Sequence, residues 1–255
     1  MIEVYRLPAN RERPSTKPCA ACTSAAANAF VQAAFDELIS SDAGLSQLVR
    51  ELQKNRLQAV VFGGWTRDRL AELLTGQSHP SRDIDFVSSG SPSVKSLFPP
   101  EAARNPFGGV GYDSLRIHID AWDLPETFLF RRNSGPVEFD RLPSTADYNV
   151  NAVIFQPSQF FDESGLLDLG AGEALVQKKL DFMADEVAQP RFQAARSVIL
   201  AARLGLSISD TVQRFVRDVC STQSALASVT TGIENYCPLP YRSEALERLR
   251  TLLSI

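Results

Sequence analysis

The sequence of 255 residues is poor in the residues that build disulfide scaffolds and zinc sites, with four cysteines and two histidines. Only Cys19 and Cys22 have the Cys-x-x-Cys spacing of metal and redox sites. A structural zinc site with four ligands would need two further cysteines or histidines nearby, and the only histidines are His79 and His118. The sequence therefore predicts free thiols, without a structural zinc site.

Long hydrophobic runs are absent as well. The longest apolar stretches, such as residues 59–62 and 197–202, fall far short of the roughly 20 residues that a bilayer span needs. The N-terminus places arginines among proline and asparagine residues and has no continuous apolar core, which is not typical of a secretory signal. We therefore expect a cytoplasmic protein that has no membrane partner.

A large excess of charge of one sign is also missing. The 26 lysines and arginines face 30 aspartates and glutamates, so the formal net charge is −4 and any site for a polyanion must be local. Hydrophobic residues make up 44% and charged residues 22% of the chain, close to globular averages, which excludes wholesale disorder. The length allows one large domain, or one domain with an appended helical part, but not two independent enzymes.

Hydrophobic periodicity divides the chain into three parts. Residues 1–23 have no clear period and are interpreted as a tail or extended arm. Helical spacing predicts two helices within 24–55, another at 65–74, and a helical pattern from 185 onward. Short apolar or alternating runs predict strands at 57–62, 82–87, 115–121, 150–155 and 166–169. We therefore predict an α/β (α+β) head at 24–183, with a small mixed sheet flanked by helices, and a helical neck or cap at 184–255.

Two glycines between a predicted strand and a predicted helix form the first functional motif. Gly63 and Gly64 let the backbone approach a ligand closely, and the helix N-terminus after them offers free N–H groups to a phosphate. Asp83 and Asp85 follow about fifteen residues after the motif and lie two apart on a predicted strand. Their carboxylates therefore share one face, within reach of one or two divalent cations. The combination predicts a phosphate site beside a metal site.

A third carboxylate comes from the predicted strand 115–121. Alternation places His118, Asp120 and Trp122 on one face, and we predict that Asp120 is the third metal ligand, with Asp123 as the alternative. Two metal ions bridging three carboxylates would orient an attacking hydroxyl group. They would also stabilise the charge that develops on a nucleoside triphosphate and on the departing pyrophosphate.

These residues, together with their neighbours, resemble a known signature. Gly63-Gly64, Arg67-Asp68, Leu70 and Asp83-x-Asp85 are similar to the Gly-Gly-x-x-Arg-Asp-x-Leu and Asp-x-Asp motifs of the class II tRNA CCA-adding enzymes and bacterial poly(A) polymerases, in the polymerase-β-like nucleotidyltransferase superfamily. Fainter similarity continues to the family's Arg-Asp-Phe-Thr-Ile-Asn-Ala segment at 147–152 and to its neck helix at 196–205.

The chain also departs from the family pattern. Thr145-Ala146 precedes Asp147 where the family segment begins with arginine, and Gln193 stands at the position of one neck arginine. The family's nucleotide-selecting Glu-Asp-x-x-Arg motif has no clear counterpart in this sequence. Base selection would therefore rest on other residues or be loose.

The resemblance implies a metal-dependent nucleotidyltransferase that moves a nucleoside monophosphate from a nucleoside triphosphate to an acceptor hydroxyl and releases pyrophosphate. It supports Asp83 and Asp85 as catalytic, Mg²⁺-binding residues, with Mn²⁺ as the alternative ion, and strand alternation adds Asp120 to them, with Asp123 as the competing choice. The nucleotide-binding residues that it implies are Gly63, Gly64, Arg67, Asp68, Asn149, Asn151 and Arg196.

Each of these residues also has a purely structural interpretation. Arg67 and Asp68 could form an exposed ion pair on a helix surface, and Asp83 and Asp85 could be solvated residues of an edge strand. The asparagines at 149 and 151 could satisfy backbone groups at the start of a strand, and Arg196 could belong to a solvated helix face.

The acceptor stays open at the level of sequence. Residues 185–255 contain 8 arginines, no lysine and 7 acidic residues, a balance too small for a broad tRNA-binding surface. The first hypothesis is transfer to the 3′ end of a tRNA or another RNA. The second is a toxin-like or regulatory transferase that modifies a protein or a small molecule, and the third is a nucleotide-binding module without turnover.

Overall fold

The computed structural model describes residues 3–105, 108–132 and 135–254, which form two compact units. The α/β unit comprises residues 16–146 and 150–173, and the helical unit comprises the described residues before 16 together with 147–149 and 174–254. The predicted tail is thus divided, since its residues up to Ser15 belong to the helical unit, while residues 1–2 lie outside the described part. The chain enters the helical unit at Ala174, ten residues before the neck or cap that the sequence predicts.

The α/β unit is built on a sheet of seven strands in the order β4-β5-β6-β3-β2-β7-β8. Strands β3 and β6 pair in parallel and the other neighbours pair antiparallel, so the sheet is mixed, as the sequence predicts for this α/β (α+β) fold. The strands are β2 (Ala59–Phe62), β3 (Asp83–Ser88), β4 (Ala103–Arg104), β5 (Val110–Asp113), β6 (His118–Asp123), β7 (Val153–Gln156) and β8 (Gly165–Asp168).

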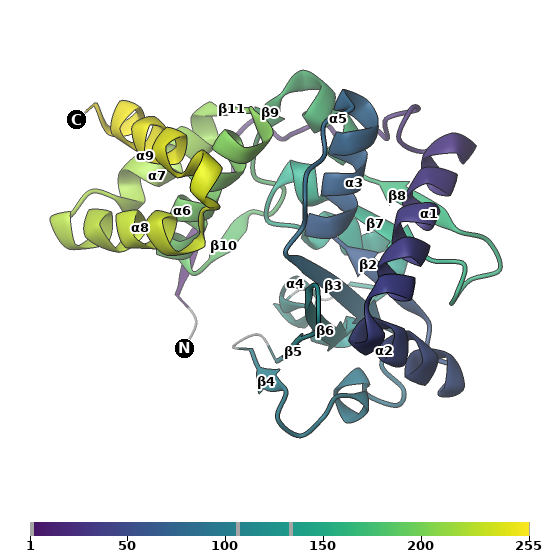
Figure 1. Cartoon of the computed structure of the whole chain (residues 1–255). Coiled ribbons are helices and arrows are strands. Elements are labelled where there is room, and N and C mark those ends of the chain that lie inside the picture. The colour runs from purple at the N-terminus through teal and green to yellow at the C-terminus, as the bar shows by residue number, and fades with distance from the viewer. Residues whose placement is uncertain (1–2, 106–107, 133–134, 255) are drawn as a thin grey trace. The chain divides into compact units, whose positions relative to one another are not determined.

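Three helices cover one face of this sheet (Figure 1). They are α1 (Ala25–Ser41), α2 (Ala43–Lys54) and α3 (Gly64–Thr75). Phe35 of α1 is fully buried, and its ring centroid lies 5.9 Å from Trp65, 6.1 Å from Phe86 and 5.7 Å from Phe155. One aromatic side chain therefore joins the helices to the middle strands of the sheet.

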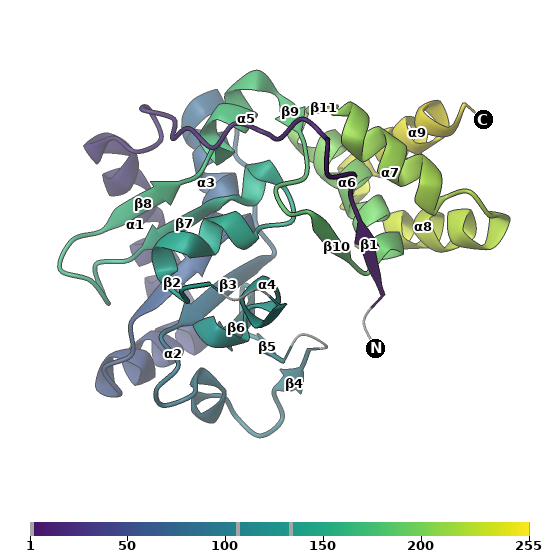
Figure 2. The ribbon, with the colours of Figure 1, turned by 180° about the vertical axis from the view of Figure 1, so that it is seen from behind.

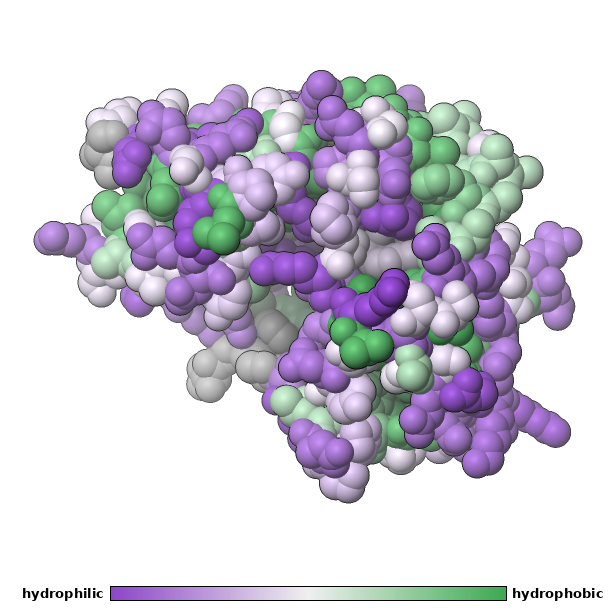
Figure 3. All heavy atoms as spheres, viewed as in Figure 1, coloured by the Kyte–Doolittle hydropathy of each residue, from purple (hydrophilic) through white to green (hydrophobic). Residues whose placement is uncertain are grey.

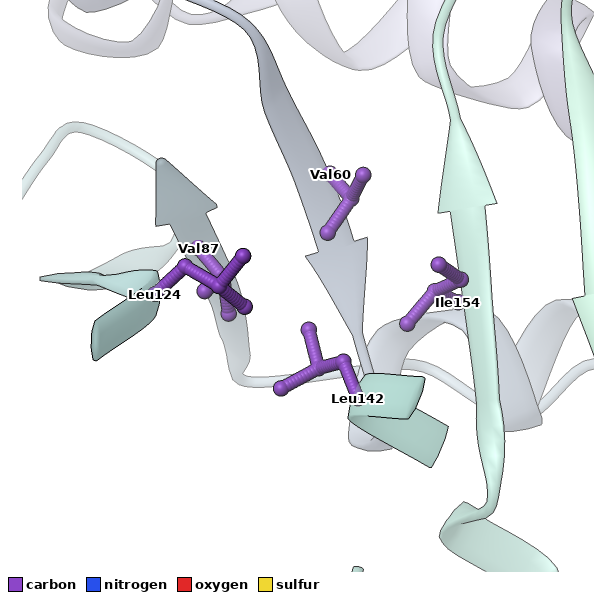
Figure 4. Close-up of a cluster of buried hydrophobic side chains, with 5 residues drawn as sticks. All are labelled: Val60, Val87, Leu124, Leu142 and Ile154. Atoms are coloured by element: carbon purple, nitrogen blue, oxygen red, sulfur yellow. The ribbon is translucent and has the colours of Figure 1, made fainter. Parts of the chain in front are cut away.

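The opposite face carries a second apolar cluster, drawn in Figure 4. Val60, Val87 and Ile154 rise from three neighbouring strands and pack with Leu124 and Leu142. Short helical segments cover this face (Figure 2): η2 (Leu124–Glu126), α4 (Phe128–Arg132) and η3 (Phe139–Thr145). The remaining short segments of the chain are η1 (Val94–Leu97), η4 (Asn149–Asn151) and α5 (Ala171–Gln177).

Four helices dominate the helical unit: α6 (Pro190–Leu204), α7 (Asp210–Val219), α8 (Gln223–Tyr236) and α9 (Leu239–Leu253). Its short strands are β1 (Val4–Arg6), β9 (Lys179–Leu180), β10 (Glu186–Ala188) and β11 (Ser207–Ile208). Strand β1 runs antiparallel to β10 (Figure 2), and β9 pairs with β11 in parallel. The ring of Phe182 stacks on Tyr148 at 5.1 Å and meets Phe215 edge-on at 4.9 Å, in the core of this unit.

The N-terminal segment differs from a free tail in one respect. Arg11 is 7% exposed, and its guanidinium group donates hydrogen bonds to the backbone oxygens of Phe182, Met183 and Ala184. A sequence pattern cannot predict this anchor, because the acceptors are carbonyl groups about 170 residues away. Residues 186–188, which fall within the predicted helical pattern, form a strand because β1 supplies their partner.

Two predicted strands begin later than the sequence indicates. Residues 114–117 form a turn in which Ser114 N donates to Ile117 O over 3.1 Å, so β6 starts at His118 instead of residue 115. Residues 149–151 form a 3-10 turn, and β7 starts at Val153 instead of residue 150. In this turn Asn149 N donates to Asp181 O over 2.9 Å, so residue 149 pairs with a distant segment and not with a neighbouring strand of the seven-stranded sheet.

Hydrophilic residues cover most of the surface that Figure 3 shows, with apolar residues interspersed among them. No helix in the described part of the chain is both long and apolar enough to span a lipid bilayer.

Candidate active site

The turn between β2 and α3 brings backbone and carboxylate groups together. Gly63 has φ +67° and ψ −110°, a conformation that disfavours any residue with a Cβ, and its N–H donates to Val153 O over 3.1 Å. In the register of β2 and β3, Phe62 lies opposite Asp85, so two residues further along Gly64 comes level with Asp83. Asp83 Oδ1 is accordingly 3.8 Å from the point where a Cβ on Gly64 would stand.

Three carboxylates occupy one face of two parallel strands. Asp85 of β3 lies opposite Asp120 of β6, and Asp83 lies opposite His118. Asp83 is exposed, whereas Asp85 and Asp120 are half-buried. Because side chains two apart on a strand point to the same face, the structure brings together the three aspartates that the sequence predicts as a group.

The surroundings of Asp120 are crowded with acidic groups. Burial raises the pKa of its carboxyl group, nearby His118 and a hydrogen bond from Asn105 lower it, and the charges of Asp83 and Asp113 raise it again, with a net pKa above the ordinary value. His118 Nε2 lies 3.5 Å from Asp120 Oδ2. Repulsion between these carboxylates favours the binding of a cation at this face.

A glycine leaves room for this arrangement. A Cβ on Gly111 would stand 2.9 Å from His118 Nε2 and 3.2 Å from Asp120 Oδ1. Any side chain at this position of β5 would therefore displace the histidine or the carboxylate.

Asp123 has a different environment from Asp120. It is 6% exposed and points to the face opposite Asp120, since it is three positions further along β6. Its carboxylate accepts hydrogen bonds from Ser88 Oγ (3.1 Å), Ser93 Oγ (2.5 Å) and Val94 N (2.8 Å). These bonds tie η1 to the sheet, and the geometry thus favours Asp120 over Asp123 as the third carboxylate of the site.

Arg67 and Asp68 form a buried network and are 3% and 1% exposed, so the alternative of an exposed helix-surface pair is wrong. Arg67 Nε and Nη2 donate to Asp68 Oδ1 over 2.9 and 2.8 Å, and Nη1 donates to Asn151 Oδ1 over 2.7 Å. Asp68 Oδ2 accepts a hydrogen bond from Ser81 Oγ (2.7 Å). The network holds together α3, the segment before β3 and the end of η4. Arg67 Nη2 lies 3.9 Å from the Cβ point of Gly64.

Asn149 and Arg196 belong to the helical unit. The side chain of Asn149 donates to Lys179 O over 3.0 Å and accepts from Asp181 N over 2.9 Å, which agrees with its structural interpretation. Arg196 Nη1 lies 4.0 Å from Asp147 Oδ2. The α/β unit thus gathers Gly63, Gly64, Arg67, Asp68 and Asn151 with the three aspartates, whereas these two residues lie in the other unit.

The donor set fits Mg²⁺ bound together with phosphate groups. No group of three or more His, Cys, Asp or Glu side chains among the described residues is placed to hold a metal ion by itself. Mg²⁺ commonly takes one or two carboxylates and completes its shell with water and substrate phosphates. Carboxylates on neighbouring strands beside a glycine turn match that requirement, and Mn²⁺ accepts the same oxygen ligands.

Sequence reasoning missed part of the site. Asn105 and Gly111 border Asp120. Asn105 follows β4 in the connection to β5, and Gly111 lies in β5, in a region where the sequence shows only a segment rich in proline and glycine. Ser81 lies two residues before Asp83, and that proximity is the only signal in the sequence for its hydrogen bond to Asp68.

Comparisons with known proteins relate the chain to one class of structures. No protein-family profile matches the sequence, and no curated protein matches it significantly. Among solved structures, a CCA-adding enzyme in an apo form matches with TM-score 0.55 and 15% identity, covering 81% of this chain and 49% of the other. A tRNA nucleotidyltransferase complexed with a primer tRNA and an incoming ATP analog matches with TM-score 0.54 and 17% identity, covering 80% and 60%.

A CCA-adding enzyme from Thermotoga maritima, complexed with tRNA, matches with TM-score 0.52 and 16% identity, covering 81% of this chain and 48% of the other. The chain thus spans about half to three fifths of the length of these structures. At this level of identity the similarity concerns the fold. The chain therefore has a nucleotidyltransferase-like fold, the one found in CCA-adding enzymes.

Proposed function

We propose that this chain is a metal-dependent nucleotidyltransferase, which moves a nucleoside monophosphate from a nucleoside triphosphate to an acceptor hydroxyl and releases pyrophosphate. The observation that carries the proposal is the register of the sheet, which sets Asp83 and Asp85 beside the Gly63-Gly64 turn and Asp120 opposite Asp85. Solved structures of the same fold include CCA-adding enzymes in complex with ATP and with CTP.

The glycine turn receives the triphosphate in this proposal. No side chain caps the first turn of α3, so its backbone N–H groups can donate to phosphate oxygens. Arg67 contributes a positive charge next to Gly64, and Asp68 with Asn151 fixes the orientation of that guanidinium group. Asn149 and Arg196 remain predicted nucleotide contacts.

The three aspartates hold Mg²⁺ together with the phosphates, and Mn²⁺ is the alternative ion. A bound divalent ion would neutralise charge on the triphosphate and on the leaving pyrophosphate. Asp83 and Asp85 lie nearest the glycine turn and therefore bind on the donor side. Asp120, one strand further from the turn, orients the acceptor hydroxyl and accepts its proton.

The 3′ end of a tRNA or another RNA is the first acceptor to test, since two of the similar structures contain tRNA. A protein or small-molecule acceptor is the second candidate. Its support is the charge of residues 185–255, where 8 arginines face 7 acidic residues and provide little attraction for a long RNA backbone.

The test is incubation of the full chain with each of the four labelled nucleoside triphosphates and Mg²⁺, with and without total tRNA, followed by gel analysis and pyrophosphate detection. We expect pyrophosphate release that requires the divalent ion and is abolished in Asp83→Ala. Label on tRNA identifies an RNA acceptor, and label on protein or in a small product identifies the second candidate. Binding of nucleotide without pyrophosphate release under every condition would instead indicate the module without turnover.

A further inference from the structure

Two cysteines, outside the site described above, lie together beside the turn that connects β8 to α5. Cys19 is partly exposed, whereas Cys22 is 0% exposed. Cys22 N donates to Cys19 O over 2.9 Å, and the two thiols are hydrogen-bonded to each other. One tight turn therefore places a partly exposed cysteine next to a fully buried one.

The segment that packs against this pair has a glycine where the two cysteine side chains approach its backbone. A Cβ on Gly172 would stand 2.4 Å from Cys22 Sγ and 2.6 Å from Cys19 Cβ. Both cysteine side chains thus converge on the backbone of Gly172, where any larger residue would push them apart.

A buried carboxylate fixes the position of the turn. Asp168, which is 3% exposed, accepts hydrogen bonds from Cys19 N (2.9 Å), Ala171 N (2.7 Å) and Gly172 N (3.2 Å). The first bond holds the cysteine turn, and the other two hold the segment that it packs against. Asp168 is therefore a positioning residue for the pair.

The two thiols differ in reactivity. Burial raises the pKa of the Cys22 thiol, and the neighbouring Cys19 and the charge of Asp168 raise it further. A buried thiol with a raised pKa is a poor first nucleophile, whereas a partly exposed cysteine can meet a reagent from solution. A third ligand that would make the pair a metal site is not present among the described residues.

We propose that Cys19 and Cys22 form a reversible redox site that is oxidised by low-molecular-weight disulfides. The Cys19 thiolate attacks one sulfur of the small disulfide, breaks its S–S bond and releases one thiolate, which leaves a mixed disulfide on Cys19. The Cys22 sulfur then attacks the Cys19 sulfur and closes the intramolecular disulfide, and the second small thiolate leaves and takes up the proton that Cys22 gives up. The protein dithiol loses two electrons, and the small disulfide becomes two thiols.

The test exposes the reduced, folded full chain to oxidised glutathione, blocks the remaining thiols and digests the protein with trypsin. Trypsin does not cut before proline, so Arg13-Pro14 and Lys17-Pro18 stay intact and residues 12–50 form one peptide that contains both cysteines. We expect this peptide to lose the mass of two hydrogens, and reduced glutathione to restore it. Two of the four thiols should disappear from a thiol titration, with Cys220 and Cys237, both buried, unchanged.

Variants separate the steps. Cys22→Ser should accumulate a glutathione adduct on Cys19, because no second thiol resolves it, whereas Cys220→Ser should behave like the wild type. Gly172→Ala should slow closure of the disulfide. Asp168→Asn tests whether Asp168 positions the pair, and a positioning role predicts a higher ratio of glutathione adduct to intramolecular disulfide than in the wild type. A lasting adduct on the wild-type protein, oxidation only after unfolding in denaturant, or equal oxidation of Cys220 and Cys237 would overturn the proposal.

Discussion

The two faces of strands β2, β3 and β6 differ at one end, where one face is apolar and the other is acidic. Under the helices α1 and α3, the strands present Val61, Phe86 and Ala121, all of which are fully buried. On the other face, the same strands present Asp85 and Asp120 at one end, and an apolar cluster follows immediately along the strands (Figure 4).

Strands β3 and β6 therefore each contribute to the stability of the fold with one face and to the candidate site with the other. The helix-covered face excludes water and stabilises the fold by hydrophobic burial, and an unpaired charge buried there would be destabilising. The other face leaves its acidic end half-exposed, so the carboxylates are solvated and reachable. Substitutions on the two faces should therefore affect different measurements.

The largest effect should come from the acidic face. Asp85→Asn removes a carboxylate between Asp83 and Asp120 and should reduce nucleotidyl transfer at least about a thousandfold, or ~4 kcal/mol of transition-state stabilisation. Unfolding temperature should stay close to that of the wild type, because Asp85 is half-buried and belongs to a repulsive cluster. Asp113→Asn is the matched control, since it removes an exposed charge of the same cluster and should retain activity. Equal activity of Asp85→Asn and this control would contradict the site.

The second effect belongs to the helix-covered face. Phe35→Ala removes a ring that contacts Trp65, Phe86 and Phe155, and should lower the free energy of unfolding by about 3–4 kcal/mol. Denaturant unfolding measures this loss, and transfer per folded molecule at low temperature should change little. A large loss of activity in the folded fraction would mean that the two faces are not independent.

The two glycines of the turn between β2 and α3 allow stability and nucleotide binding to be tested separately. Gly63→Ala forces a Cβ onto φ +67° and should cost about 1–3 kcal/mol of stability. Gly64 lies in ordinary helical conformation, and a Cβ there would meet Asp83 and Arg67 at 3.8 and 3.9 Å, which is normal contact. Gly64→Ala should thus leave the unfolding temperature nearly unchanged while it weakens nucleotide binding, as equilibrium titration with a nonhydrolysable triphosphate would measure. Unaltered affinity would remove the turn from the phosphate site.

The smallest effect concerns the carboxylate that caps α2. Burial raises the pKa of Asp42, but hydrogen bonds from Leu45 N, Ser114 Oγ and Arg116 N outweigh it and bring the pKa below 3.8. A carboxyl group whose pKa is lowered by folding stabilises the folded state at pH values above its pKa in the unfolded chain. This stabilisation is lost as the pH falls through the pKa of the folded state. Asp42→Asn replaces one carboxylate oxygen by an amide nitrogen, which cannot accept hydrogen bonds, and should therefore cost about 1 kcal/mol at pH 7. This difference should shrink as the pH falls below 3.8. Thermal unfolding at both pH values measures it, and a pH-independent difference would refute this origin.

The sequence predicted the residues of the site better than their contacts. Alternation was enough to group Asp83 with Asp85 and to set Asp120 on the same face as His118, because the strand period is fixed by backbone geometry. It could not decide between Asp120 and Asp123, because the groups that hold the Asp123 carboxylate come from residues 88–94, about 30 residues earlier in the chain. It also missed the burial of Arg67, whose partner Asn151 lies 84 residues away.

What the sequence determined by itself is local: the strand, glycine turn and helix at 57–74, the Asp-x-Asp strand, and the helical character of most of the region from 185 onward. These features follow from side-chain periodicity and from the backbone freedom of glycine, which act within a few residues. Only the tertiary structure decided that β3 and β6 pair in parallel, that Arg11 anchors the N-terminal segment, and that Cys19 and Cys22 meet Gly172. Each of these depends on residues far apart in the chain, which are brought together only when the sheet and the apolar core form.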